Sequence, residues 1–221
     1  MANPQARFNA LGDFFLSPGA EQQSPGMRDG SCPEEKVGGQ AMATQVELAL
    51  QGIITTVMRE IASQEGMEPE TIRRRIAEGQ IVVPLNANRP ATVVGIGTGL
   101  RSKVNASIGT STDIIDFKAE VRKAQAAEAA GADTLMELSV GGDLDKVRRE
   151  VLAAVNIPVG NVPLYQAFCE ATRRYGDPNK LEEEMLFDLI ERQCADGISF
   201  MAIHCGINLF SIERLERQGY R

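Results

Sequence analysis

The 221-residue sequence has little of several residue types that commonly carry chemistry. It has no tryptophan and a single histidine, His204, and aromatic residues make up 5% of the chain. Its four cysteines are Cys32, Cys169, Cys194 and Cys205. They form no CxxC pair, so their spacing indicates neither a zinc ribbon nor a redox motif.

Long apolar runs and excess positive charge are also missing. No apolar run reaches the ~18 residues that cross a bilayer, and the N-terminus lacks a charged segment followed by an apolar one. The net charge is −7, so nothing indicates a nucleic acid or an acidic membrane surface as a partner. We therefore expect a cytoplasmic protein with reduced thiols that binds a small molecule, not nucleic acid or membrane.

The composition changes near residue 42. Residues 1–41 are rich in Gly, Pro, Ser and Gln and bury too little surface to offset the entropy of ordering, so we expect a disordered or wrongly assigned extension. From Met42 onward, apolar periodicity predicts two helices separated by Gly52 and a third that ends at Gly79, followed by the strand-like segment IVVPL. We assign residues 42–100 to a small, mainly helical N-terminal region.

The segment GIGTGL does not indicate a dinucleotide-binding loop. Gly95, Gly97 and Gly99 are followed by Leu100 where that motif needs its third glycine. No clear strand, turn and helix surround the glycines, so we reject the Rossmann interpretation.

After residue 100, strand-like and helix-like segments alternate. RSKVNASIGTS precedes a helix capped by Asp116, and DTLMELSVGG precedes a helix capped by Asp143. NIPVGNVPLY is followed by a longer predicted loop through DPN and by the helix LEEEMLFDLIERQCADG, which ends at Gly197. GISFMAIHCGI and the helix NLFSIERLERQGYR form the fourth unit.

This alternation predicts an α/β protein with a parallel sheet. Four βα units are half of a (βα)8 barrel, a fold that needs ~250 residues, so we expect residues 101–221 to be the first half of a truncated TIM-type barrel. An open doubly wound sheet is the alternative.

Polar or small residues are predicted where the four strands end, which is the catalytic face of such barrels. His204 is predicted at the carboxyl end of the fourth strand, with Cys205 still on that strand, and Tyr165 follows the third. The alternative for a lone histidine after an apolar run is a core side chain. The first two strands are predicted to close with Asn105, Ser107, Thr110, Glu137, Ser139 and Gly141. Alternation places Met136 and Glu137 on opposite faces and leaves open which one faces the barrel axis.

Four segments, KVNASIGTS, GADTLMELSVGGDLD, IPVGNVPLYQA and MAIHCGIN, resemble the phosphomethylpyrimidine synthase family, and the resemblance extends from Met42 to Arg221. It implies a radical S-adenosylmethionine lyase of the carbon–carbon class. In that family a 4Fe-4S cluster cleaves S-adenosylmethionine, and the resulting radical rearranges 5-aminoimidazole ribonucleotide into the phosphorylated hydroxymethylpyrimidine of thiamine biosynthesis. The resemblance also implies a zinc-type metal and a homodimer of the full-length protein.

The family's substrate contacts fall on Ser107, Met136, Tyr165 and His204, and no catalytic residue is identified. Thiamine-pathway members read KVNAN where this chain reads KVNAS, so Ser107 replaces an amide. The forms KVNASIGTSTDI and MELSVGG resemble the branch of 5-hydroxybenzimidazole synthases of anaerobic cobamide biosynthesis, which use the same substrate. The product stays open between the two branches.

The family's CxxCxxxxC motif and its metal-binding histidines do not occur in this sequence. We therefore predict no metal ligands in this chain, and we expect it to be the N-terminal part of a longer protein and to be inactive alone. The alternative is a non-catalytic half-barrel that binds a nucleotide or another half-barrel.

Overall fold

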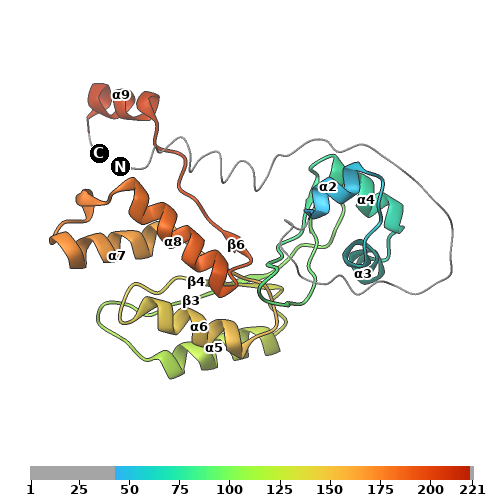
Figure 1. Cartoon of the computed structure of the whole chain (residues 1–221), viewed down its shortest axis with the longest axis horizontal. Coiled ribbons are helices and arrows are strands. Elements are labelled where there is room, and N and C mark those ends of the chain that lie inside the picture. The colour runs from blue at the N-terminus through green and yellow to red at the C-terminus, as the bar shows by residue number, and fades with distance from the viewer. Residues whose placement is uncertain (1–42, 220–221) are drawn as a thin grey trace. The chain divides into compact units, whose positions relative to one another are not determined.

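The computed structural model describes residues 43–219, so the predicted extension at residues 1–41 lies outside them. The described residues from Gln45 onward belong to one compact unit, and Figure 1 shows its helices and strands. No helix within the described range combines the length and apolarity that a membrane crossing needs.

The described chain begins with three helices, α2 (Gln45–Leu50), α3 (Thr56–Glu65) and α4 (Pro69–Ala77). Gly52, with φ of 81°, separates α2 from α3 as predicted, and Gly79, with φ of 70°, follows α4. The Thr55 hydroxyl caps α3 by accepting a hydrogen bond from the Met58 backbone N–H at 3.2 Å. The three helices share one apolar core with Ala49, Met58, Ile61, Ala62, Ile72, Ile76 and Ile81.

A short antiparallel pair follows, β1 (Ile81–Val82) and β2 (Ile96–Gly97). A Cβ atom on Gly97 would lie 2.0 Å from the Gln80 carbonyl oxygen, so the close approach of the two backbones requires glycine. The next helix after β2 is α5 (Phe117–Ala129), twenty residues on, which agrees with rejecting a dinucleotide-binding loop here.

Four parallel strands form the main sheet in the spatial order β3-β4-β5-β6. The strands are β3 (Asn105–Ile108), β4 (Thr134–Glu137), β5 (Val159–Asn161) and β6 (Phe200–Met201). The elements that alternate with them are α5, α6 (Leu144–Ala154), α7 (Pro163–Tyr175), η1 (Pro178–Lys180), α8 (Glu183–Asp196) and α9 (Leu209–Gln218). The α/β class and the parallel sheet are therefore confirmed.

The predicted helix boundaries of the first two βα units are confirmed. The side chains of Asp116 and Asp143 cap α5 and α6 by accepting hydrogen bonds from backbone N–H groups, each at 3.0 Å. Gly197, with φ of 106°, ends α8 as predicted.

One face of the sheet packs against α5 and α6. Ile108, Leu135 and Val159, from three adjacent strands, share an apolar core with Ala124, Val147 and Val151 of the two helices. Because side chains alternate along a strand, the intervening residues lie on the opposite face. We call this the second face and define it by Ser107, Met136, Gly160 and Phe200, which are register partners across the four strands.

Two predictions for the segments after β5 were wrong. Helix α7, thirteen residues long, occupies the segment predicted as a loop. Its buried face consists of Pro163, Gln166, Ala167 and Ala171.

The second error concerns Cys205, which was predicted to lie on the fourth strand. Strand β6 ends at Met201, and Cys205 is exposed beyond it. The ladder stops because β5 ends at Asn161, whose carbonyl accepts the last hydrogen bond, from the Ala202 N–H at 2.9 Å.

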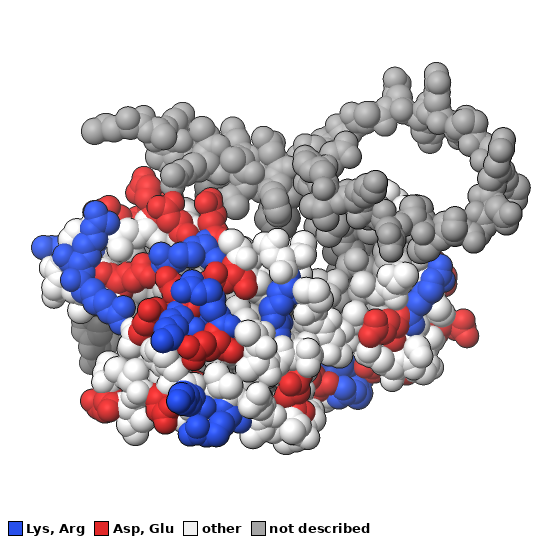
Figure 2. Space-filling view, turned by 60° about the horizontal axis from the view of Figure 1, so that its bottom comes forward, with Lys and Arg blue, Asp and Glu red and all other residues white. Residues whose placement is uncertain are grey.

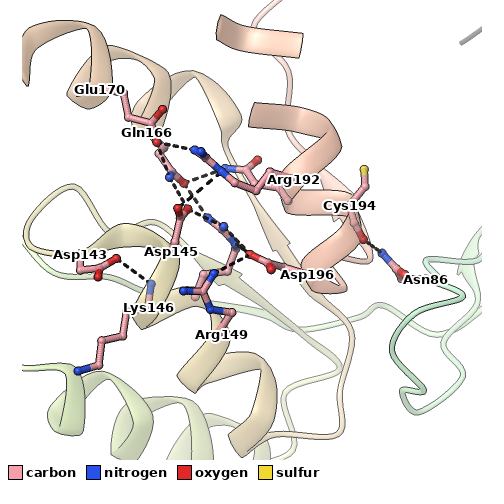
Figure 3. Close-up of polar contacts among 12 residues, drawn as sticks. Asn86, Asp143, Asp145, Lys146, Arg149, Gln166, Glu170, Arg192, Cys194 and Asp196 are labelled. Carbon is pink, nitrogen blue, oxygen red and sulfur yellow. Dashed lines mark hydrogen bonds and ion pairs between the residues drawn. The ribbon is translucent and has the colours of Figure 1, made fainter. Parts of the chain in front are cut away.

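The NANRP loop ties the N-terminal helical region to the ends of two βα units. The Asn86 side chain donates to the carbonyls of Cys194 at 2.8 Å and Ile198 at 2.7 Å, and Figure 3 shows the first of these contacts. The Arg89 guanidinium donates to three carbonyls at the end of α6 and in the turn after it, those of Leu152, Val155 and Ile157. One loop therefore supplies side-chain donors to carbonyls at the ends of α6 and α8 and in the segments that follow these helices.

Charged side chains of both signs are intermixed on the face that Figure 2 shows, although the net charge is −7. Other charged side chains form a buried hydrogen-bonded network that connects α6, α7 and α8 (Figure 3). Arg148 is 1% exposed and donates to Asp145 at 2.7 Å, Asp196 at 2.6 Å and Gln166 at 2.7 Å. Gln166 belongs to the first turn of α7, so this network fixes where that helix starts.

Candidate functional site

Two of the predicted substrate residues lie side by side on the second face. Ser107 of β3 and Met136 of β4 are register partners, which places their side chains on adjacent strands at the same level. Ser107 is exposed, and Met136 is 8% exposed. The structure therefore answers the question that alternation left open, because Met136 faces away from α5 and α6 and Glu137 faces toward them.

The other two predicted residues form an aromatic pair. Tyr165 is the third residue of α7, and His204 lies three residues beyond the end of β6. Their ring centroids are 5.9 Å apart and their planes are inclined by 37°. The contact arises because β5 and β6 are parallel neighbours, so the segments that follow them leave the sheet at the same edge. Both side chains are exposed.

Three of the predicted strand-end residues bind one another. The Thr110 hydroxyl donates to the Gly141 carbonyl at 2.7 Å, and the Thr110 N–H donates to the Ser139 hydroxyl at 3.0 Å. All three belong to the loops after β3 and β4, and Thr110 and Ser139 are buried. These hydrogen bonds hold the loop after β3 against the loop after β4 at the carboxyl end of the sheet.

The sequence prediction misplaced Asn105, whereas Glu137 does end its strand, on the side of the sheet that alternation left open. Asn105 is the first residue of β3, so it lies at the amino end of the sheet, where its side chain accepts a hydrogen bond from the Thr134 hydroxyl at 3.0 Å. The error arose because the strand begins four residues later than RSKVNASIGTS suggested. Glu137 is 6% exposed and accepts from the Ser139 N–H at 2.9 Å.

The carboxyl group of Glu137 has an unusual electrostatic environment. Burial raises the pKa of Glu137, although hydrogen bonds from Ser139 and the charge of Arg148 act in the opposite direction. The negative charge of Glu120 on α5 raises it further. Glu137 therefore lies between the sheet and its helices and does not contribute to the second face.

The described residues do not fit the iron-sulfur cluster or the zinc-type metal that the resemblance implies. Within residues 43–219, no three His, Cys, Asp or Glu side chains come together to hold a metal ion. Cys169 lies in α7 with its sulfur 3.5 Å from the Val140 carbonyl oxygen, Cys194 lies in α8, and Cys205 lies beyond β6. Burial raises the pKa of Cys169 and of Cys194, which disfavours the thiolate form that binds metal.

Sequence reasoning missed two residues of the second face, Gly160 and Phe200. Gly160 is the register partner of Met136 on one side and of Phe200 on the other. A signal was present, because a glycine inside an apolar strand segment, here IPVGNVP, commonly marks a place where another group approaches the backbone closely.

Comparisons with known proteins agree on one family. The chain is 69% identical over 180 residues to the 5-hydroxybenzimidazole synthases of Geobacter sulfurreducens and of Geobacter metallireducens. It is 53% identical over 176 residues to phosphomethylpyrimidine synthase 1 of Methanosarcina barkeri. These matches cover 81%, 81% and 80% of the chain and 41% of each relative, so the chain spans less than half the length of these curated relatives.

A family model described as the Radical SAM ThiC family matches residues 44–221, which include all four segments that carry the resemblance. Ser107, Met136, Tyr165 and His204 lie within the matched range. This chain therefore belongs to the Radical SAM ThiC family.

Proposed function

We propose that this chain provides substrate-binding residues of a radical S-adenosylmethionine synthase that converts 5-aminoimidazole ribonucleotide into 5-hydroxybenzimidazole. The observation that carries the product assignment is the difference between 69% identity to 5-hydroxybenzimidazole synthases and 53% identity to a phosphomethylpyrimidine synthase. The serine at position 107 favours the same branch. The pyrimidine product of thiamine biosynthesis is the second candidate, supported by that 53% identity.

We also propose that the four βα units belong to a (βα)8 barrel whose axis the second face lines. The strands follow one another in chain order and each pairs in parallel with the next, which is the connectivity of such a barrel. This arrangement supports the division at residue 100 into a helical N-terminal region and a barrel segment.

The roles proposed for this chain are binding and orientation of the ribonucleotide. Tyr165 offers an aromatic face with a hydroxyl at its tip, and His204, 5.9 Å away, can donate or accept one hydrogen bond. Ser107 offers a hydroxyl, and Met136 offers a polarizable apolar surface beside it. Such a site holds a flat, polar heterocycle better than it holds a long apolar ligand.

A chimeric enzyme tests the proposal. Residues 42–221 of this chain replace the matching segment of the Geobacter sulfurreducens 5-hydroxybenzimidazole synthase, and the product formed anaerobically from 5-aminoimidazole ribonucleotide is identified by chromatography. We expect 5-hydroxybenzimidazole. The pyrimidine phosphate as product would overturn the branch assignment, and a folded chimera that binds the ribonucleotide without turnover would favour a non-catalytic binding module.

Ser107→Asn in the same chimera tests whether this position sets the product. The longer amide adds a second hydrogen-bonding group next to Met136, so we expect part of the product to shift from the benzimidazole to the pyrimidine. An unchanged product ratio would mean that product choice lies outside this chain.

A further inference from the structure

We propose that Phe200, held over Gly160, forms with Met136 an apolar floor that receives the flat ring of the substrate. The inference rests on the proposed function, because it assumes that the second face binds a ribonucleotide. Neither Phe200 nor Gly160 was among the four residues that the resemblance implied.

The register of the sheet puts these residues at one level. Ser107 pairs with Met136, Met136 pairs with Gly160, and Gly160 pairs with Phe200. In-register neighbours on parallel strands project to the same side, so the row Ser107, Met136, Gly160 and Phe200 crosses the whole second face.

The missing side chain of Gly160 makes room for the Phe200 ring. A Cβ atom on Gly160 would lie 2.3 Å from Cε2, 2.5 Å from Cζ and 2.6 Å from Cδ2 of Phe200, so the ring lies directly over the glycine backbone. Gly160 does not have the left-handed backbone that favours glycine, since its φ lies outside that range. Space for the ring, and not backbone conformation, is therefore what requires glycine here.

Because Gly160 has no side chain, the Phe200 ring can extend from the edge strand β6 toward the middle of the sheet. From β6, the Phe200 ring extends over β5, whose other neighbour at this level is Met136. Phe200 is only partly buried, and its neighbour Met201 packs into the helix-side core instead. The second face thus carries an aromatic ring over β5 and a largely buried thioether on the neighbouring β4, with the Ser107 hydroxyl at one end.

This combination suits a flat heteroaromatic ring. An aromatic face and a methionine sulfur both gain favourable contacts with another ring, and neither offers a hydrogen bond to a ribose or a phosphate. The floor should therefore recognise the imidazole ring of the ribonucleotide and not its ribose 5-phosphate part.

The test compares two ligands on the 221-residue chain by titration calorimetry: 5-aminoimidazole ribonucleotide and ribose 5-phosphate, which lacks the ring. We expect Phe200→Leu to weaken binding of the ribonucleotide by roughly two- to tenfold, the range of one aromatic contact, and to leave ribose 5-phosphate unaffected. Gly160→Ala should have the same selective effect, because the new methyl group displaces the Phe200 ring.

Phe117→Leu is the matched control, since Phe117 packs against the helix-side core on the other side of the sheet. We expect it to leave the preference between the two ligands unchanged. If Phe200→Leu weakens both ligands equally, or if Phe117→Leu changes the preference as much, the floor is refuted while the proposed function stands. If the unaltered chain binds neither ligand, the floor is refuted, and the product formed by the chimera decides the proposed function separately.

Discussion

Replacing Arg148 with methionine is expected to lower the free energy of unfolding by about 3–5 kcal/mol, the cost of removing one partner of a buried ion pair. The Arg148 guanidinium is 1% exposed and donates to two carboxylates, those of Asp145 at 2.7 Å and Asp196 at 2.6 Å. Methionine fills a similar volume but donates nothing. The loss therefore comes from unpaired polar groups and not from a cavity.

The solvent exposure of the two carboxylates determines where in the range of about 3–5 kcal/mol the loss of unfolding free energy falls. The side chains of Asp145 and Asp196 are 27% and 16% exposed, so water can reach both carboxylates after the substitution. Gln166, 6% exposed, keeps its contact with Asp145, and its side-chain oxygen loses Arg148 but still accepts from the Gln193 side chain at 3.0 Å. We therefore expect a value near the lower end, about 3 kcal/mol.

The measurement is urea unfolding followed by circular dichroism, with Arg149→Met as the matched control. Arg149 is the next residue, contacts the same Asp196 at 3.8 Å and has a side chain that is 56% exposed, so its loss should cost no more than about 1 kcal/mol. The urea dependence should be the same for both variants. Equal losses for the two arginines would refute the reasoning that burial makes Arg148 the essential partner.

The remaining predictions concern pH, the NANRP loop, the candidate site and the sheet edges. The raised pKa of Glu137 means that its stabilising contribution is present below the unfolded pKa of about 4.3 and is lost as pH rises through the folded pKa. Glu137→Gln should therefore be more stable than the unaltered chain at pH 7, with a difference that vanishes on acidification; a constant difference from pH 4 to 8 would contradict this. Arg89→Ala should cost on the order of 3 kcal/mol in urea unfolding, because three carbonyls lose a charged donor, whereas Arg122→Ala, at an exposed pair, should cost under about 1 kcal/mol. His204→Ala should change the melting temperature little but weaken ribonucleotide binding by about 0.5–1.5 kcal/mol, since the ring is exposed; a large loss of stability would indicate a structural histidine instead. Because β3 and β6 lie at the two ends of the sheet that the described residues form, the isolated chain should self-associate in sedimentation, and a monodisperse monomer would speak against this.

The elements that the sequence predicted well are those whose signals are local. Asp116 and Asp143 cap their helices through their own side chains, and Gly52 and Gly197 adopt left-handed backbones that other residues avoid. Such contacts depend only on nearby residues. For this reason the ends of these helices could be predicted without knowing their neighbours in space.

The errors concern features that depend on distant contacts. The first turn of α7 is held by the buried Gln166, which accepts a hydrogen bond from Arg148 eighteen residues earlier in the sequence. Strand β6 is short because its neighbour β5 ends at Asn161, which the sequence around His204 does not indicate. The contact between Gly160 and Phe200 joins residues forty positions apart, so only the sheet register could pair them.

The strand order of the main sheet also has a consequence for how the chain folds. Each strand pairs with the one before it in the sequence, so β4 can join β3 before β5 has left the ribosome. Strands that are near each other in the sequence can pair by forming short loops, which favours rapid folding. The Asn86 side chain is different, because its partners at Cys194 and Ile198 are 108 and 112 residues away. The NANRP loop can therefore close onto the end of α8 only after nearly all of the described chain has been synthesised, which makes this contact a late step of folding.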